Sequence, residues 1–251
     1  MTDTSAPEGP ASAAFASEAP TSKGPTLAGA RTIGILGGTF NPPHRGHLAL
    51  ARHALGELGL ERVLLMPAHN APHKGEEGDP GPERRLEMCR LAVGGEEQEG
   101  LEACGLEVER GGPSYTVDTL RAIKQSDPEA ELTFILGADM ARTLPAWREP
   151  RALVELSRLA VAEREDTSRA EVLGALAPLS ARVRFLAMPT LDVSSSMVRE
   201  RVRHGEPIAG LVAPEVAEYI AEHRLYRTAS ENTKANTQAQ APAPARAKAW
   251  K

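Results

Sequence analysis

The feature that most constrains the fold of this chain is the alternation of two kinds of segment between residues 31 and 227. Short apolar runs rich in branched residues are separated by longer stretches in which apolar residues recur at the helical period. This alternation is typical of βαβ units and a parallel sheet. We therefore predict an α/β fold of Rossmann-like type, with an open, doubly wound parallel sheet.

The same patterns place the expected elements along the chain. Strands are expected at 32–36, 62–66, 105–108, 132–136, 159–162 and 183–186. Helices are expected at 47–58, 82–93, 115–125, 150–156, 168–176, 195–204 and 214–223. In such sheets ligands bind outside the carboxyl ends of the strands, near the point where the strand order reverses. We therefore expect the functional residues in the loops that follow the strands.

The two ends of the chain differ in composition from the part between them. Residues 1–30 and 228–251 are rich in Ala, Pro, Ser and Thr and poor in large apolar residues. Such segments cannot bury enough surface to offset the entropy of ordering them. We predict two disordered tails around one folded domain, residues 31–227.

Composition excludes several classes of protein. With 29 Lys and Arg against 34 Asp and Glu, the formal net charge is −5, which gives no overall attraction to nucleic acid or an acidic membrane. No apolar run reaches the roughly eighteen residues that a membrane span needs. The two cysteines, Cys89 and Cys104, form no CxxC pair, which argues against a disulfide scaffold or a thiolate metal site. We expect a soluble, cytoplasmic protein.

The first expected strand runs into a glycine-rich loop, Ile-Gly-Ile-Leu-Gly-Gly-Thr-Phe-Asn-Pro-Pro-His-Arg-Gly-His over 33–47. Gly37 and Gly38 lack a Cβ, so the backbone can approach a phosphate closely. His44 and His47 are three residues apart at a helix start, so both rings can face one point near the positive end of the helix dipole. The loop lacks the P-loop and dinucleotide-binding patterns. On these residues alone, a glycine-rich turn with two surface histidines remains an alternative.

A second candidate phosphate loop lies near the other end of the domain. Residues 191–199 have the sequence Leu-Asp-Val-Ser-Ser-Ser-Met-Val-Arg. Three serines at a helix start can cap the helix and donate hydrogen bonds to an anion. Arg199, one turn into the helix, could direct its guanidinium at the same anion. A plain serine cap on an exposed basic helix fits equally well.

Three further segments follow expected strands. Residues 67–74 end in His73 and Lys74, which can meet a phosphate, although a solvated loop has the same composition. Residues 113–120 have the pattern of a capped helix start, and capping alone would explain them. Residues 136–147 end in Trp147, which beside a proline can offer a flat face to a planar ring but is more often part of a core.

Together these motifs resemble the nucleotidyltransferase superfamily with the His-x-Gly-His signature, which it shares with class I aminoacyl-tRNA synthetases. The form Gly-Gly-Thr-Phe-Asn-Pro-Pro-His-Arg-Gly-His is similar to that of nicotinate-nucleotide adenylyltransferases. Val-Ser-Ser-Ser-Met-Val-Arg over 193–199 is similar to the superfamily's Ile-Ser-Ser-Thr-x-Ile-Arg motif. The same family has a Pro-Pro-His-Lys loop, in which Ala71 replaces the first proline here, a Pro-Ser-Tyr-Thr segment, and Gly-x-Asp with a tryptophan eight residues later. The resemblance covers nearly all of 31–227.

The resemblance implies an enzyme of NAD biosynthesis that joins the AMP part of ATP to nicotinate mononucleotide, releasing pyrophosphate. The residues it implies at the α-phosphorus and the leaving pyrophosphate are His44, His47 and Arg199. The other residues it implies for ATP are Gly37, Gly38, Thr39, Phe40, Asp139, Arg164, Ser195 and Ser196. Those it implies for the pyridine nucleotide are His73, Lys74, Thr116, Trp147 and Arg148. Mg²⁺ would arrive with ATP, since it keeps several waters and prefers phosphate oxygens, and no protein metal ligand is expected.

Other readings stay open. A relative in the same superfamily could use nicotinamide mononucleotide, pantetheine phosphate or glycerol phosphate as the acceptor. A regulator could keep the fold and bind nucleotide without turnover. Nucleic-acid binding through the basic residues 199–203 is disfavoured by the net charge. The sequence leaves open whether the chain forms a homo-oligomer.

Overall fold

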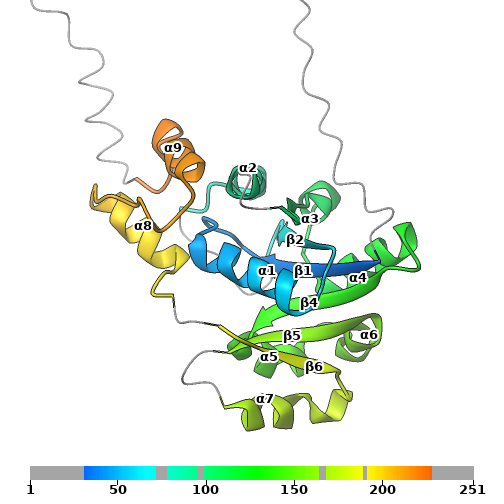
Figure 1. The fold of residues 1–251 in the computed structure, drawn as a ribbon. Helices are drawn as coiled ribbons and strands as arrows, with labels where there is room; N and C mark the ends of the chain where they lie inside the picture. Colours follow the sequence, from blue (N-terminus) through cyan, green and yellow to red (C-terminus); the bar gives the residue numbers. More distant parts are fainter. Residues whose placement is uncertain (1–30, 72–77, 95–98, 164–167, 189–190, 228–251) are drawn as a thin grey trace, which may run out of the picture.

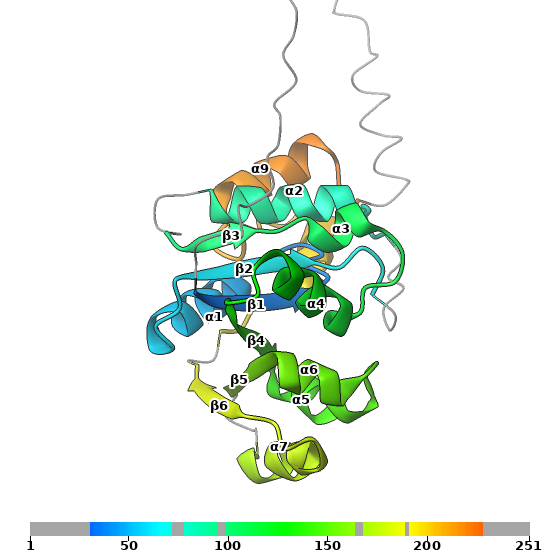
Figure 2. The same ribbon diagram turned by 90° about the vertical axis from the view of Figure 1, so that its right-hand side faces the viewer.

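The centre of the fold is a six-stranded sheet. The computed structural model describes residues 31–71, 78–94, 99–163, 168–188 and 191–227. All strand pairs are parallel, in the order β3-β2-β1-β4-β5-β6. Figure 1 labels the strands from β2 to β6 in this order, and Figure 2 also labels β3, beside β2. The strands are β1 (Thr32–Gly38), β2 (Arg62–Pro67), β3 (Leu101–Ala103), β4 (Glu131–Gly137), β5 (Ser157–Glu163) and β6 (Val183–Ala187). The order reverses between β1 and β4, so the predicted doubly wound sheet is confirmed.

Helices cover both faces of the sheet. They are α1 (Arg45–Glu57), α2 (Pro82–Val93), α3 (Leu106–Arg110), α4 (Thr116–Ser126), α5 (Ala138–Thr143), α6 (Pro150–Leu156), α7 (Arg169–Leu176), α8 (Ser195–Arg203) and α9 (Pro214–Glu222). Two 3₁₀ turns, η2 (Leu144–Ala146) and η3 (Ala177–Leu179), follow α5 and α7. In Figure 2, α1 lies on the opposite side of the sheet from α4, α5 and α6. Among the described residues, none of the helices is long and apolar enough to cross a membrane.

Two apolar cores follow from the alternation of side chains along the strands. Leu64 and Met66 of β2 face a core formed with α4, α5, α6 and α7. Val63 and Leu65 of the same strand face a core formed with α1, α2, α8 and α9. Because both of their faces are covered, the central strands β1, β2 and β4 consist mainly of buried residues, and their apolar runs are the reason that the sequence pattern located them.

The prediction of a strand at 105–108 is wrong. The third strand lies earlier, at Leu101–Ala103, and Gly105 precedes the short helix α3. Cys104 still donates its backbone N–H to the Leu65 carbonyl (2.9 Å), after which the chain leaves the sheet. Glu107 is buried in α3, where its carboxylate accepts a hydrogen bond from the Thr119 hydroxyl (2.6 Å). That long-range contact favours a helix over a second apolar strand.

The remaining expected elements differ from the structure only at their ends, and α5 is a helix where the sequence pattern predicts a loop. Helix α5 immediately follows β4 and consists of Ala-Asp-Met-Ala-Arg-Thr, which includes several good helix formers. Proline is the first residue of α2, α6 and α9, where its missing N–H costs nothing. The expected tails, 1–30 and 228–251, lie outside the described residues.

Candidate functional site

The two phosphate loops predicted at opposite ends of the domain meet beyond the carboxyl end of β1. Ser195, at the start of α8, donates its hydroxyl to the Pro42 carbonyl (2.9 Å). Arg199 donates from Nη1 to the Asn41 carbonyl (2.7 Å). Two hydrogen bonds across more than 150 residues therefore make the glycine-rich loop and the serine-rich helix start one structural unit.

The loop after β1 has a tightly specified backbone. Phe40 has a φ of +51°, an uncommon conformation for a residue with a side chain, and its ring is buried edge-on against the His47 ring with centroids 4.9 Å apart. The following Asn41–Pro42 peptide bond is cis. Asn41 is buried, and its Oδ1 accepts a hydrogen bond from the Tyr226 hydroxyl (2.7 Å). The loop is thus held from inside the protein rather than by solvent.

His44 and His47 form the start of α1 as a pair. Their rings are stacked with centroids 3.7 Å apart and an interplanar angle of 27°. The His44 backbone N–H donates to Nδ1 of His47 (3.2 Å), and the His44 side chain in turn faces the backbone N–H of His47, which makes a capping box of two histidines. An Nδ1 that accepts a hydrogen bond leaves the proton of the neutral ring on Nε2. Nε2–H of His47 is therefore a donor of fixed orientation.

The close packing around position 46 explains why a glycine stands between His44 and His47. A Cβ at this position would lie 3.0 Å from His44 Nδ1 and 3.2 Å from Val193 Cγ1. Any side chain would push the His44 ring away from α1 and the segment before α8 away from the loop. The third residue of His-x-Gly-His is thus fixed by the close approach of three parts of the chain.

The serines of α8 have different tasks. Ser194 is the N-cap, and its hydroxyl accepts from the Met197 backbone N–H (3.1 Å). Ser195 contacts the loop after β1, as described above, and Ser196 accepts from Arg199 Nη2 (3.3 Å). Arg199 is therefore oriented from two sides, by Ser196 on its own helix and by the Asn41 carbonyl. The N-terminus of α8 and this guanidinium give the loop region a positive character suited to an anion.

The predicted acceptor residues that the structure describes, Thr116, Trp147 and Arg148, come from the start of α4 and the residues that follow η2. Thr116 begins α4, and Arg148 lies over the ring of the preceding Tyr115, 4.6 Å from its centroid. Arg148 also pairs with Asp118 (3.5 Å). These contacts bring the start of α4 next to residues 147–148.

Trp147 is half-buried and held at two points. Its indole N–H donates to the Thr143 hydroxyl (3.1 Å), and its ring is edge-on to Phe134 of β4, with centroids 6.0 Å apart. Phe134 also faces Gly37, where a Cβ would lie 3.4 Å from its ring. Trp147 thus packs at the edge of the apolar core. Through Phe134 it is also linked to Gly37 of the glycine-rich loop.

The structure gives fewer contacts, or none, for the other predicted residues. Asp139, in α5, is largely exposed and pairs with Arg142 (2.7 Å). Gly38 ends β1, and Thr39 follows it in the loop described above. His73, Lys74 and Arg164 lie outside the described residues.

Residues 112–114 play a part that the sequence analysis did not foresee. Ser114 donates its backbone N–H to the Asn70 carbonyl and accepts the backbone N–H of His69 on its hydroxyl, both at 2.9 Å. His69 Nδ1 lies 3.2 Å from the Gly112 carbonyl. The Pro-Ser-Tyr-Thr segment therefore anchors the loop after β2 as well as starting α4. Two other supports that the sequence analysis missed are Tyr226 and the buried Arg85.

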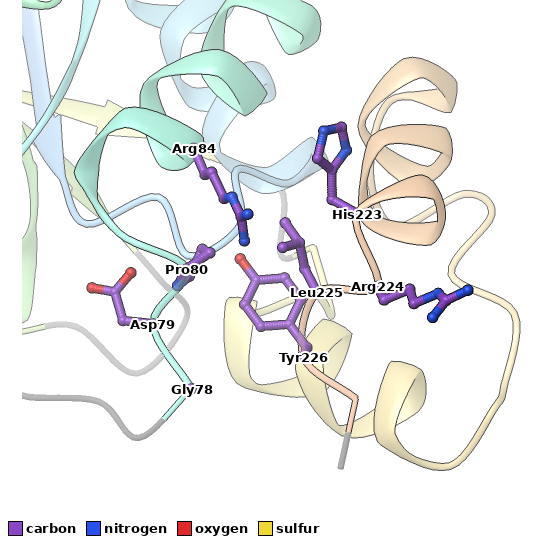
Figure 3. A pocket seen from close by; sticks show the side chains of 8 residues that line it. All are labelled: Gly78, Asp79, Pro80, Arg84, His223, Arg224, Leu225 and Tyr226. Carbon is purple, nitrogen blue, oxygen red and sulfur yellow. The ribbon is translucent and has the colours of Figure 1, made fainter. Parts of the chain in front are cut away.

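A cavity of about 450 Å³ lies beside this region, between the N-terminal end of α2 and the residues that follow α9. Figure 3 shows Tyr226 among its lining residues and Arg84 pointing toward the Tyr226 hydroxyl, while Arg224 and His223 point away. None of the predicted site residues that the structure describes lines this cavity. Its basic side chains do not converge, so we assign the candidate site to the loop after β1 and not to this cavity.

The two cysteines are buried, Cys104 in one apolar core and Cys89 in the other. Burial raises the pKa of the Cys104 thiol to about 11 and raises the pKa of Cys89 further. Both cysteines are free thiols, and because burial raises the pKa of each, neither is ionised near neutral pH. Within the described ranges, no group of three or more His, Cys, Asp or Glu side chains is arranged to hold a metal ion.

Comparisons with known proteins agree with this arrangement. The cytidylyltransferase-like family matches residues 35–201. A relative from Synechococcus sp. (strain JA-3-3Ab), named "Probable nicotinate-nucleotide adenylyltransferase", is 43% identical over 198 residues, which cover 78% of this chain and 95% of the relative. A relative of the same name from Bacillus licheniformis is 40% identical over 198 residues, with coverage of 79% and 100%.

A solved structure supports the fold independently. The Plasmodium falciparum nicotinic acid mononucleotide adenylyltransferase complexed with NaAD has a TM-score of 0.65 at 19% identity, over 78% of this chain and 97% of that chain. At this identity the likeness concerns the fold alone. The family match and the two bacterial relatives, together with the paired histidines and the helix start that meet beyond β1, show that this chain belongs to the nicotinate-nucleotide adenylyltransferase family, within the cytidylyltransferase-like group.

Proposed function

We propose that this chain transfers the adenylyl group of ATP to the 5′-phosphate of nicotinate mononucleotide, forming nicotinate adenine dinucleotide and pyrophosphate. The observation that carries the proposal is the meeting of the stacked His44–His47 pair with the start of α8 beyond the carboxyl end of β1. That place is where doubly wound sheets bind nucleotides. The names of the bacterial relatives supply the substrate.

The reaction needs positioning and charge stabilisation more than acid–base chemistry. An oxygen of the acceptor phosphate forms a bond to the α-phosphorus, and the bond from that phosphorus to the oxygen bridging to the β-phosphate breaks, releasing pyrophosphate. A phosphate monoester is already anionic near neutral pH, so no strong base is required. His44 and His47 would donate to the α-phosphate oxygens, where charge is redistributed in the transition state.

The leaving pyrophosphate is assigned to α8. Ser195, Ser196 and Arg199 would surround its oxygens, with the backbone N–H groups of the helix start adding to the positive field. Gly37, Gly38, Thr39 and Phe40 would line the ATP phosphates, with Asp139 and Arg164 as further contacts. Mg²⁺ is proposed to enter with ATP, bound by phosphate oxygens rather than by protein side chains, and to neutralise part of their charge.

The acceptor is assigned to the start of α4 and the residues that follow η2. Trp147 would stack on the pyridine ring, with Thr116 and the backbone near Arg148 receiving the carboxylate. The edge-on contact with Phe134 and the bond to Thr143 support this role, because they hold the indole at a fixed angle. His73 and Lys74 would approach the acceptor phosphate. Two buried free thiols are compatible with a reducing compartment, and a cytoplasmic location is part of the proposal.

The test is pyrophosphate release from MgATP with a panel of acceptors: nicotinate mononucleotide, nicotinamide mononucleotide and pantetheine phosphate. The proposal predicts that the acid form is used with a much higher kcat/KM than the amide, because a site that pairs with a carboxylate leaves groups unpaired when an amide replaces it. Faster use of another acceptor would replace the proposed substrate. No release with any acceptor would indicate a nucleotide-binding protein without turnover.

A further inference from the structure

Arg85, in the first turns of α2, is almost completely buried, with 2% of its side chain exposed. Its Nη1 donates to two backbone carbonyls, those of Thr39 (2.8 Å) and Ala68 (2.7 Å). Its Nη2 donates to the His69 carbonyl (2.9 Å), and its Nε to Asp79 Oδ1 (3.0 Å). A buried guanidinium is expensive unless its donors are satisfied, and here four hydrogen bonds meet that condition.

The carbonyls that Arg85 binds lie just past the last hydrogen bond between β1 and β2. The Ala68 N–H still donates to the Gly38 carbonyl (2.9 Å), but after this point the two strands diverge. Buried carbonyls beyond the ladder need other donors. Arg85 provides them, and its planar fork holds both loops at a fixed separation.

The two loops serve different substrates in the proposed reaction. Thr39 belongs to the loop that leads to His44 and His47, which is assigned to ATP. Ala68 and His69 belong to the loop after β2, which is fastened to Ser114 next to the acceptor side. Arg85 is therefore a direct link between the donor loop and the acceptor loop, made by a buried side chain.

We propose that Arg85 is a positioning residue for adenylyl transfer: by joining the carbonyls at the ends of β1 and β2, it fixes the distance between the acceptor phosphate and the α-phosphorus. This inference rests on the proposed function for its kinetic consequence. Asp79 completes the device, because its Oδ1 accepts from both Arg85 Nε and the Gly81 backbone N–H, each at 3.0 Å. The carboxylate thereby orients the guanidinium relative to the start of α2.

The test compares Arg85→Lys with Arg84→Lys, which makes the same change one residue earlier on α2. Arg84 is exposed and borders the cavity of Figure 3. Lysine keeps the charge but is a single point donor on a flexible stem, so it cannot bind three carbonyls in one plane. Each variant is assayed well below its unfolding temperature, with kcat expressed per folded molecule and the Kd of each substrate measured alone.

For Arg85→Lys we expect kcat to fall by about 10²-fold, the size of effect that follows a misplacement of about 1 Å between reacting groups. The Kd of ATP alone and of nicotinate mononucleotide alone should each change less than about threefold, because each loop keeps its own contacts. Arg84→Lys should match the wild type. A kcat for Arg85→Lys within about threefold of wild type, or a loss fully explained by weaker binding of one substrate, would overturn the proposal.

Hydrogen–deuterium exchange separates this inference from the proposed function. The backbone N–H groups of residues 39–41, 44 and 68–71 should exchange at least tenfold faster in Arg85→Lys than in Arg84→Lys, whether or not the wild type uses nicotinate mononucleotide. Unchanged exchange in these segments would show that Arg85 does not link the two loops, even if the enzyme is active. Wild-type protein that releases no pyrophosphate, yet shows the expected exchange, would instead contradict the proposed function and with it the catalytic consequence.

If Arg85→Lys does not fold, Asp79→Asn provides the milder perturbation, since Asp79 is about one-third exposed (35%). It keeps the guanidinium and its carbonyl contacts but removes the charge that orients it. We expect a fall in kcat of about tenfold, with both substrate Kd values unchanged. An Asp79→Asn enzyme with wild-type kcat and wild-type exchange would overturn the proposal.

Discussion

Replacing Gly46 by alanine should separate catalysis from stability. The new Cβ would lie 3.0 Å from His44 Nδ1, 3.1 Å from His44 Cε1 and 3.2 Å from Val193 Cγ1. Because non-bonded carbon atoms attract one another at separations of about 3.5 Å or more, the His44 ring has to move by about half an ångström. If about 1 Å of misplacement costs about 10²-fold in rate, this shift should lower kcat about tenfold.

The stability of the same variant should hardly fall. Gly46 lies inside α1 without a positive φ, so alanine gains up to about 1 kcal/mol of helix propensity, which offsets the strain of moving a partly exposed ring. Urea unfolding measures this balance, and pyrophosphate release at saturating MgATP and nicotinate mononucleotide measures kcat.

The matched control is Gly56→Ala, near the other end of α1, where an added Cβ has no neighbour within 4 Å. It should raise the free energy of unfolding by about 0.5–1 kcal/mol and leave kcat unchanged. A Gly46→Ala enzyme with kcat within twofold of wild type would refute the reasoning. So would an equal loss of kcat in both variants.

Three further perturbations test the supports of the site. Tyr226→Phe removes the donor to Asn41 Oδ1 and should lower the free energy of unfolding by about 1 kcal/mol in urea titrations; no change would show that this bond is not needed. Ser194→Ala removes the cap of α8 and should cost about 1 kcal/mol, against a few tenths for Ser194→Gly; equal losses would contradict the capping role. Burial raises the pKa of Cys104 to about 11, above the unfolded value of about 8.5, so its contribution to stability is complete below pH 8.5 and is lost as the pH rises toward 11. Cys104→Ala should therefore show a smaller decline in unfolding free energy over that range, and an unchanged decline would count against the burial argument.

Much of the fold follows from local patterns. Strands buried on both faces are continuous apolar runs, and prolines such as Pro82 and Pro150 mark helix starts because only there is a missing N–H harmless. The segment 105–108 was misassigned because Leu-Glu-Val has the alternation of a strand. The Glu107–Thr119 hydrogen bond that accompanies the helix joins distant residues, and local propensity does not contain that information.

The candidate site, too, could be predicted from the sequence only in part. The meeting of the loop at 37–47 with the start of α8 could be predicted, because both follow strands of a parallel sheet whose carboxyl ends share one edge. Arg85 and Tyr226 could not, since their role depends on which carbonyl or amide lies opposite in the folded chain. One signal for Arg85 was present: it shares a helix face with Cys89 and Ala92, four and seven residues later. An arginine on an apolar helix face needs buried acceptors, and the ends of β1 and β2 supply them.

The most direct test of the central claim measures nicotinate adenine dinucleotide formed from MgATP and nicotinate mononucleotide by the wild type, His47→Ala and His53→Ala. His53 lies on the same helix, outside the candidate site. We expect product with the wild type and with His53→Ala, and a loss of about 10²- to 10³-fold in kcat for His47→Ala at unchanged fold. Near-normal product formation by His47→Ala would contradict the assignment of the reaction to this site.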